Sequence, residues 1–114
     1  MPLKILILIC EDPTRSHRPV EGLRIALGLS TGPNPLTVVI MGKARLLVTD
    51  EMSDIMDSDI LEKHLPVLQE LKINILLPAG SRNEFSLDPD LSITETSPVE
   101  IASLISQADR VLVF

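Results

Sequence analysis

The apolar run Lys4-Ile5-Leu6-Ile7-Leu8-Ile9-Cys10 lies near the start of the chain, and the architecture that we expect follows from it. A strand with one face in water alternates apolar and polar residues, whereas an unbroken Ile and Leu run is typical of a central parallel strand covered on both faces. The run is far shorter than the roughly 18 apolar residues of a membrane span. It also lacks the small-residue cleavage site of a signal peptide.

Further apolar runs predict the strands that pair with the first one. Leu36–Met41 and Ile73–Leu77 are short, largely apolar segments followed by Gly42 and Pro78, and Arg110–Phe114 stays apolar to the last residue. Segments of this length and composition are typical of buried strands. The short segment 44–48 fits either a strand or the start of a helix.

Helical patterns separate these strands. Pro19 suits the first turn of a helix, and the apolar positions after it predict a helix that ends at the turn Thr31–Pro35. Ser97 and Glu100 have the spacing of a capping box, with Pro98 at the first helical position. The apolar residues that follow this box repeat with a helical period: Ile101, Leu104, Ile105 and Ala108.

The middle of the chain is acidic and less regular. The acidic residues Asp50, Glu51, Asp54, Asp57, Asp59 and Glu62 alternate with Met52, Ile55, Met56, Ile60 and Leu61. This pattern predicts an amphipathic helical region. Pro66 fits poorly inside a helix, so we expect a break near Leu65 and a short helix through Leu71. Residues 81–94 are expected to form a long polar loop.

The alternation of strands and helices predicts the fold class. It indicates an α/β protein built as a three-layer α/β/α sandwich around a mostly parallel sheet of about five strands, Rossmann- or flavodoxin-like in type. The 114 residues are expected to form a single domain, 1–114.

Composition excludes several classes of function. The net charge of −6 disfavours nucleic acid, and two phenylalanines are too few aromatic residues to stack bases. One cysteine cannot form an internal disulfide, so we expect a cytoplasmic protein, and no membrane partner. The mean hydropathy of +0.29 is high for a small domain, which predicts apolar contacts between subunits of an oligomer.

Parallel sheets bind ligands at the carboxyl ends of their strands, so candidate sites are sought in the loops 11–18 and 78–85. No Gly-x-Gly-x-x-Gly or P-loop sequence follows the first strand, and His17 and His64 are isolated from other ligand types. We therefore expect neither a cofactor nor a metal. An anion site is the alternative in these loops, because guanidinium groups bind oxyanions. Its candidate residues are Arg15, Arg18, Ser81 and Arg82.

Cys10 is the one candidate nucleophile. It follows a strand that helices are expected to cover, which predicts a buried and inert thiol. The alternative is a persulfide carrier whose thiol pKa is lowered by a nearby cation, and Arg15, His17 and Arg18 are close in sequence. Burial of the sulfur separates the two, since an enclosed thiol cannot exchange with a partner.

The chain resembles the DsrE/DsrF-like proteins of sulfur relay, which include the TusB, TusC and TusD subunits. The resemblance covers nearly the whole chain and is carried by four segments: Lys4–Ile9, Pro19–Leu29, Leu36–Met41 and the ending Ser106–Phe114. In the members that carry persulfide, the active cysteine follows the third major strand. Here that segment reads Ile75-Leu76-Leu77-Pro78-Ala79-Gly80-Ser81-Arg82, without a cysteine.

The resemblance therefore implies the DsrF/TusC type, which lacks the thiol and supports a partner subunit. Pro66 and its neighbours also resemble that branch. We expect a non-catalytic subunit rather than an enzyme. The resemblance implies assembly as a homo-oligomer (trimer or hexamer) or as a hetero-oligomer with other sulfur-relay subunits.

Overall fold

The computed structural model describes residues 2–50 and 54–114. Its centre is a five-stranded sheet in the order β4-β3-β2-β1-β5, with every neighbouring pair parallel. The strands are β1 (Ile5–Ile9), β2 (Leu36–Ile40), β3 (Ile75–Pro78), β4 (Ile93–Thr96) and β5 (Arg110–Val113). The helices are α1 (Arg18–Ser30), the 3-10 helix η1 (Gly42–Val48), α2 (Ser58–Leu71), α3 (Ser81–Glu84) and α4 (Pro98–Gln107).

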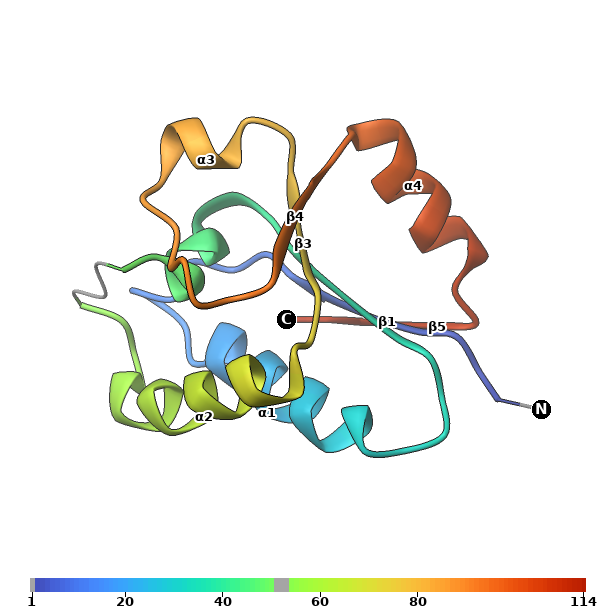
Figure 1. Cartoon of the computed structure of the whole chain (residues 1–114), viewed down its shortest axis with the longest axis horizontal. Helices are drawn as coiled ribbons and strands as arrows, with labels where there is room; N and C mark the ends of the chain where they lie inside the picture. The colour runs from blue at the N-terminus through green and yellow to red at the C-terminus, as the bar shows by residue number, and fades with distance from the viewer. Residues whose placement is uncertain (1, 51–53) are drawn as a thin grey trace.

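The helices form two layers of unequal size around the sheet, which confirms the predicted α/β/α sandwich. Helices α1 and α2 lie on one side of the sheet and α4 on the other (Figure 1). The larger core joins α1, α2 and η1 to the strands, and Leu23, Leu47 and Leu61 are fully buried in it. The smaller core, under α4, holds three buried residues: Leu6, Val39 and Ile101.

Strand β1 has the role that its apolar sequence predicts. It lies between β2 and β5, with Ile5 in register with both Leu36 and Arg110. Its side chains are buried on both faces except at Leu8, which is half-buried. Helix α1 packs close to it at Gly22, where a Cβ atom would lie 3.1 Å from Ile9 and 3.0 Å from Phe114.

Helix α2 corrects the expected break at Pro66, because it continues without interruption from Ser58 to Leu71. Pro66 is exposed, so water can bond the carbonyl group that the missing N–H leaves free. Leu61, Leu65 and Leu68 are buried on both sides of the proline and hold the two halves of the helix on the sheet. The burial of these leucines therefore outweighs the free-energy cost of a proline inside the helix.

The helix begins later than the acidic pattern predicts. Asp54 and Asp57 have positive φ angles of 62° and 60°, which a continuous helix does not allow. Asp57 is the residue before α2, and Ile55 is buried against the core. The part of the prediction that concerns Glu51 and Met52 lies outside the described residues.

Two further segments differ from expectation. The ambiguous segment 44–48 belongs to η1, whose Ala44, Leu47 and Val48 are buried. The predicted polar loop 81–94 contains α3 and the beginning of β4. The sequence does not predict β4, because this edge strand is only four residues long and three of the four, Thr94, Glu95 and Thr96, are polar. The prediction of α4 is confirmed, and Ser97 caps it by accepting a hydrogen bond from the Glu100 N–H at 3.2 Å.

The larger core makes a direct prediction about stability. Leu23→Ala removes a fully buried side chain between α1 and the sheet and should lower the free energy of unfolding by about 3 kcal/mol. Ile60→Ala is the matched control on α2, where the side chain is 37% exposed, and should cost less than about 1 kcal/mol. Urea unfolding monitored by circular dichroism measures both, and equal losses would contradict this account of the core.

Candidate functional site at the carboxyl edge of the sheet

The carboxyl ends of the strands carry the segments in which sites were predicted. The loop 10–17 follows β1, Met41 leads from β2 into η1, and Ala79 and Gly80 lead from β3 into α3. All of them lie at one edge because the sheet is parallel. The side chains at this edge form two separate groups, one beside β1 and β5 and one beside β3 and β4.

Cys10 is exposed, so the predicted burial of its thiol is wrong. Its N–H continues the β1 ladder by donating to the Phe114 carbonyl at 2.7 Å, but α1 begins eight residues later and does not cover this position. Partial desolvation, and then the negative charge of Glu11, raise the pKa of the Cys10 thiol above its ordinary value. An exposed thiol with a raised pKa is accessible but weakly nucleophilic at neutral pH.

The loop after Cys10 is organised around Asp12. Its carboxylate accepts hydrogen bonds from the Thr14 N–H at 2.9 Å and the Thr14 hydroxyl at 2.7 Å, and Lys43 Nζ lies 3.8 Å away. The Thr14 bonds hold the pKa of Asp12 below its usual range. Asp12 therefore stays ionised and is engaged within the loop by Thr14 and Lys43.

Arg18 belongs to the same group and is held beside edge strand β5. It forms an ion pair with Glu11 at 2.9 Å, donates to the Val113 carbonyl at 2.7 Å and lies over the Phe114 ring at 5.6 Å. Arg15 is exposed in the same loop. The guanidinium of Arg18 is thus occupied by the chain itself.

Arg82 lies beside β4, the other edge strand of the sheet, and its side chain also bonds groups of the chain itself. It donates to the Ile93 carbonyl at 2.9 Å, and its Nε is 3.9 Å from a Glu95 carboxylate oxygen. Strands β4 and β5 are the two edges of the sheet, so four strand spacings, about 19 Å, separate them. The structure therefore does not bring Arg18 and Arg82 together into the expected anion site.

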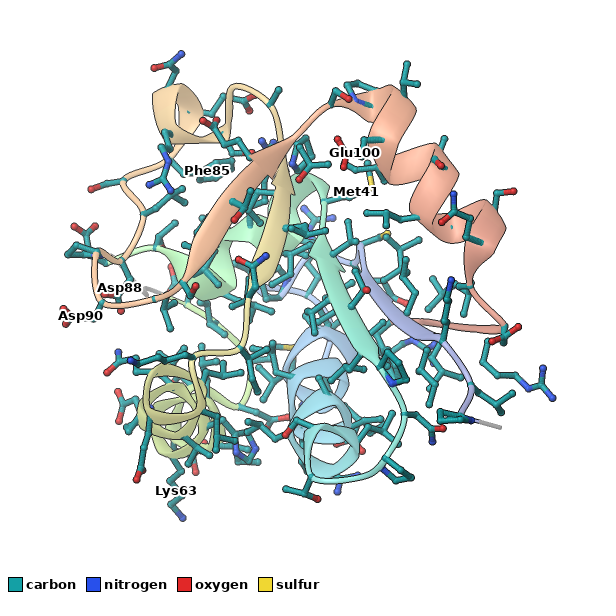
Figure 2. The ribbon with its side chains drawn as sticks, turned by 45° about the vertical axis from the view of Figure 1, so that its right-hand side comes forward. Met41, Lys63, Phe85, Asp88, Asp90 and Glu100 are labelled. Atoms are coloured by element: carbon teal, nitrogen blue, oxygen red, sulfur yellow. The ribbon has the colours of Figure 1, made fainter. Side chains whose placement is uncertain are left out.

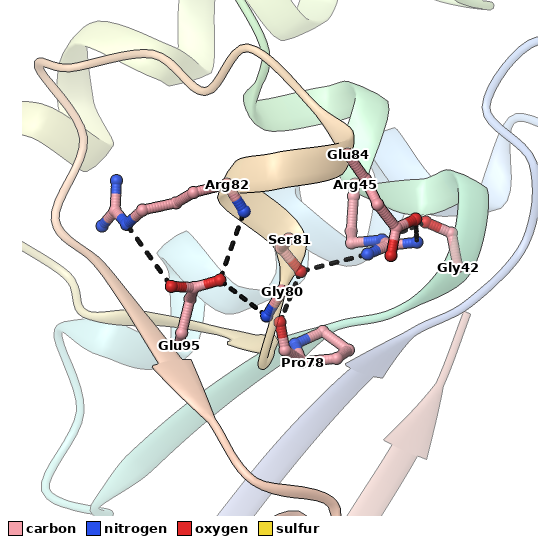
Figure 3. A network of polar contacts seen from close by, with 8 residues as sticks. All are labelled: Gly42, Arg45, Pro78, Gly80, Ser81, Arg82, Glu84 and Glu95. Atoms are coloured by element: carbon pink, nitrogen blue, oxygen red, sulfur yellow. Dashed lines mark hydrogen bonds and ion pairs between the residues drawn. The ribbon is translucent and has the colours of Figure 1, made fainter.

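Arg45 organises the group beside β3 and is the residue that sequence reasoning missed (Figure 3). Its side chain is only 11% exposed and donates to the Gly42 carbonyl, the Ser81 hydroxyl and the Glu84 carboxylate at 2.8, 3.1 and 2.9 Å. It also lies 4.6 Å from the centre of the Phe85 ring. No sequence signal marks Arg45, because it lies in the ambiguous segment 44–48 and its side-chain partners Ser81 and Glu84 lie 36 and 39 residues away.

Ser81, a predicted site residue, is fully enclosed by this group. It is 0% exposed, and its hydroxyl donates to the Pro78 carbonyl at 2.6 Å while it accepts from Arg45. The backbone N–H groups of Gly80 and Arg82 both donate to one carboxylate oxygen of Glu95, at 2.8 and 3.2 Å. The segment after β3 thus satisfies its own polar groups (Figure 3).

The two histidines give no support to a metal centre. His17 Nδ1 lies 2.7 Å from Asp57 and joins the loop after β1 to the start of α2. His64 Nε2 is buried without a hydrogen-bond partner. Among residues 2–50 and 54–114, no three His, Cys, Asp or Glu side chains gather closely enough to hold a metal ion.

The surroundings of Cys10 predict how its reactivity responds to a nearby charge. Glu11→Gln removes the negative charge that helps to raise the thiol pKa, so the pKa should fall, although partial burial keeps it above the ordinary value. Alkylation by iodoacetamide at pH 8 should then be faster than in the wild-type protein. Glu21→Gln, which changes a distant carboxylate on α1, is the control and should leave the pH profile unchanged.

The Arg45 group predicts a loss of stability. Arg45→Ala breaks three hydrogen bonds of a nearly buried guanidinium and removes a partner of the enclosed Ser81, so the free energy of unfolding should fall by about 2 kcal/mol. Arg24→Ala, which breaks the exposed pair with Glu21, should leave the urea midpoint nearly unchanged. Equal midpoints for the two variants would show that Arg45 has no structural role.

Comparisons with known proteins agree with this architecture. The crystal structure of the ychN protein from E. coli has a TM-score of 0.75 and 22% sequence identity to this chain, and the match covers 100% of both chains. This likeness shows the fold. The search of the curated proteins finds no match. No helix among the described residues is long and apolar enough to cross a membrane.

The family model gives the stronger result. The model of the DsrE/DsrF-like family matches residues 3–114, which is almost the entire chain. That membership supports a role related to sulfur relay in general terms. The all-parallel sheet, the covered β1 and the match over the full length lead to one conclusion: the chain belongs to the DsrE/DsrF-like family.

Proposed function

We propose that this protein is a non-catalytic subunit of an intracellular, cytoplasmic sulfur-relay assembly. The observation that carries the proposal is the segment after β3, where persulfide-carrying relatives have their cysteine. Here the segment has Ser81 and no thiol, and the serine hydroxyl is enclosed and bonded at both its donor and its acceptor side. A nucleophile has to be reachable by its partner, and this group is not.

The backbone around Ser81 supports the same proposal. Two N–H groups at the start of α3, those of Gly80 and Arg82, could hold a negatively charged sulfur species or another anion. Glu95 already fills that position with its own carboxylate. The segment therefore works as a rigid structural element rather than as an acceptor of substrate.

Exposed apolar side chains favour assembly with other subunits. Val111, Leu112 and Val113 on edge strand β5 are 36%, 38% and 52% exposed, and Val99 on α4 is 81% exposed. Isolated apolar side chains are common on surfaces, but an edge strand with three of them in succession is a typical contact site. We propose a homo-oligomer (trimer or hexamer) or a hetero-oligomer with other sulfur-relay subunits.

One observation favours a second function, a persulfide carrier that uses Cys10. The thiol is exposed at the carboxyl edge of β1, where a partner protein can reach it. Its raised pKa opposes this role, because partial desolvation and the negative charge of Glu11 keep the sulfur protonated. An anion-binding module has less support, since Arg18 and Arg82 have internal partners at opposite edges of the sheet.

A persulfide transfer experiment separates these functions. We expect that incubation with a cysteine desulfurase, cysteine and pyridoxal phosphate adds no sulfur to the chain, and intact-mass measurement detects such a gain directly. Cys10→Ala should leave the oligomeric state unchanged. A stoichiometric gain of one sulfur atom that disappears in Cys10→Ala would instead establish the carrier.

A further inference from the structure

Strand β5 forms one edge of the sheet, and every second residue along it directs its backbone groups outward. Phe114, just after the strand, faces β1: its N–H donates to the Leu8 carbonyl at 2.8 Å, and its carbonyl accepts from the Cys10 N–H at 2.7 Å. Because the backbone groups of successive residues point to opposite sides of a strand, Val113 and Val111 face away from the sheet. Their N–H and carbonyl groups form the open side of β5.

Strand β4 forms the other edge and alternates in the same way. The helices cover the faces of the sheet, and β4 stands at its front in Figure 2. The Ile75 N–H of β3 donates to the Ser92 carbonyl at 2.8 Å, so the next residue, Ile93, faces outward. Glu95, two residues further on, faces outward as well. Each edge strand is only four residues long, so two residues make up its open side.

An arginine binds one outward carbonyl at each edge. The Arg18 guanidinium donates to the Val113 carbonyl of β5 at 2.7 Å, and the Arg82 guanidinium donates to the Ile93 carbonyl of β4 at 2.9 Å. Both side chains are more than half exposed, so burial does not explain their positions. Each guanidinium instead occupies the place that a further strand would take.

A glutamate stands beside each of these arginines. Arg18 Nε lies 2.9 Å from a Glu11 carboxylate oxygen, and Arg82 Nε lies 3.9 Å from one of Glu95 (Figure 3). A guanidinium carries five N–H donors in a planar fork, so it can face a carboxylate and a carbonyl at once. The same arrangement thus arises twice, once from the first residue of α1 and once from α3.

We propose that Arg18 and Arg82 close the two edges of the sheet against strand addition, so that a partner contacts the side chains of this chain and does not extend its sheet. The open side of an edge strand is a template for pairing with another chain. A strand that approaches β5 or β4 has to displace a guanidinium from its carbonyl. This inference goes beyond the proposed function and holds for a second copy and for a different protein alike.

Strand β5 shows why closure matters. Val111, Leu112 and Val113 are all partly exposed, and a run of exposed apolar residues on an open edge favours uncontrolled pairing of strands. Arg18 bonds the backbone of this run and leaves its side chains exposed. The side chains therefore remain available for a contact between subunits, while the backbone does not.

Sedimentation velocity of arginine variants tests the proposal. Arg18→Ala and Arg82→Ala each free one outward carbonyl and should strengthen self-association about tenfold, since a strand no longer has to displace a charged hydrogen bond. Each change makes the net charge of −6 more negative, which by itself opposes association. Arg15→Ala is the matched control: Arg15 lies in the same loop as Arg18, and its side chain bonds none of the described residues. Equal association of all three variants would overturn the proposal.

A proline at the open side distinguishes strand addition from a loss of folding. The Val111 N–H faces outward, so Val111→Pro breaks no bond to β1 but removes a donor that an added strand needs. In the Arg18→Ala background it should return the sedimentation to that of the wild type, whereas Val111→Ala, which keeps the N–H, should not. Association that persists with the proline would overturn the proposal. Circular dichroism verifies that each variant is folded.

Amide hydrogen exchange of the wild-type protein gives an independent measurement. At a concentration where the protein is assembled, the N–H groups of Val111 and Val113 should exchange quickly, while that of Leu112, which faces β1, should exchange slowly. Slow exchange at Val111 and Val113 would overturn the closure of the edge and leave the assembly intact. A monomeric wild type with fast exchange at both residues would overturn the assembly and support the closure.

Discussion

A parallel sheet has to be covered on both faces, because its strands are apolar on both, and the unequal cover of this sheet governs the rest of the molecule. On one face α1, α2 and η1 bury a large core in which the apolar side chains of β1, β2 and β3 are enclosed. On the other, α4 is ten residues long and encloses Leu6, Val39 and Ile101, while Leu8, Met41 and Leu76 stay half-buried. The apolar surface that α4 leaves uncovered is the physical reason to expect partner subunits.

At the carboxyl edge of the sheet, the polar groups of the segment after β3 form a closed network. In the segment after β3, the polar groups that could receive a substrate bind one another, with Arg45 bonded to Ser81 and Glu84, and Glu95 bonded to the backbone of α3. A buried polar network of this kind is stable only when every member has a partner. Its completeness favours rigidity over ligand exchange, and this supports the non-catalytic role that we propose.

The surroundings of the Cys10 thiol also disfavour chemistry, because they lower its reactivity. Cys10 is exposed, but partial desolvation and the negative charge of Glu11 raise the pKa of its thiol, while Arg18 is turned toward Val113 and Phe114. Thiol reactivity depends on a stabilised thiolate, and the Arg18 guanidinium, which bonds Glu11 and the Val113 carbonyl, does not supply that stabilisation. Exposure and reactivity are therefore separate properties of this residue.

The sequence by itself determined the fold class, because the Ile and Leu run of β1 and the capped periodicity of α4 are local patterns that agree with the final structure. The tertiary structure decided the properties that depend on distant partners. Pro66 stays inside α2 because leucines on both sides are buried, and β4 forms because β3 offers it an edge. The exposure of Cys10, the bonds of Arg45 and the separation of Arg18 from Arg82 depend on contacts across many residues, which no local pattern encodes.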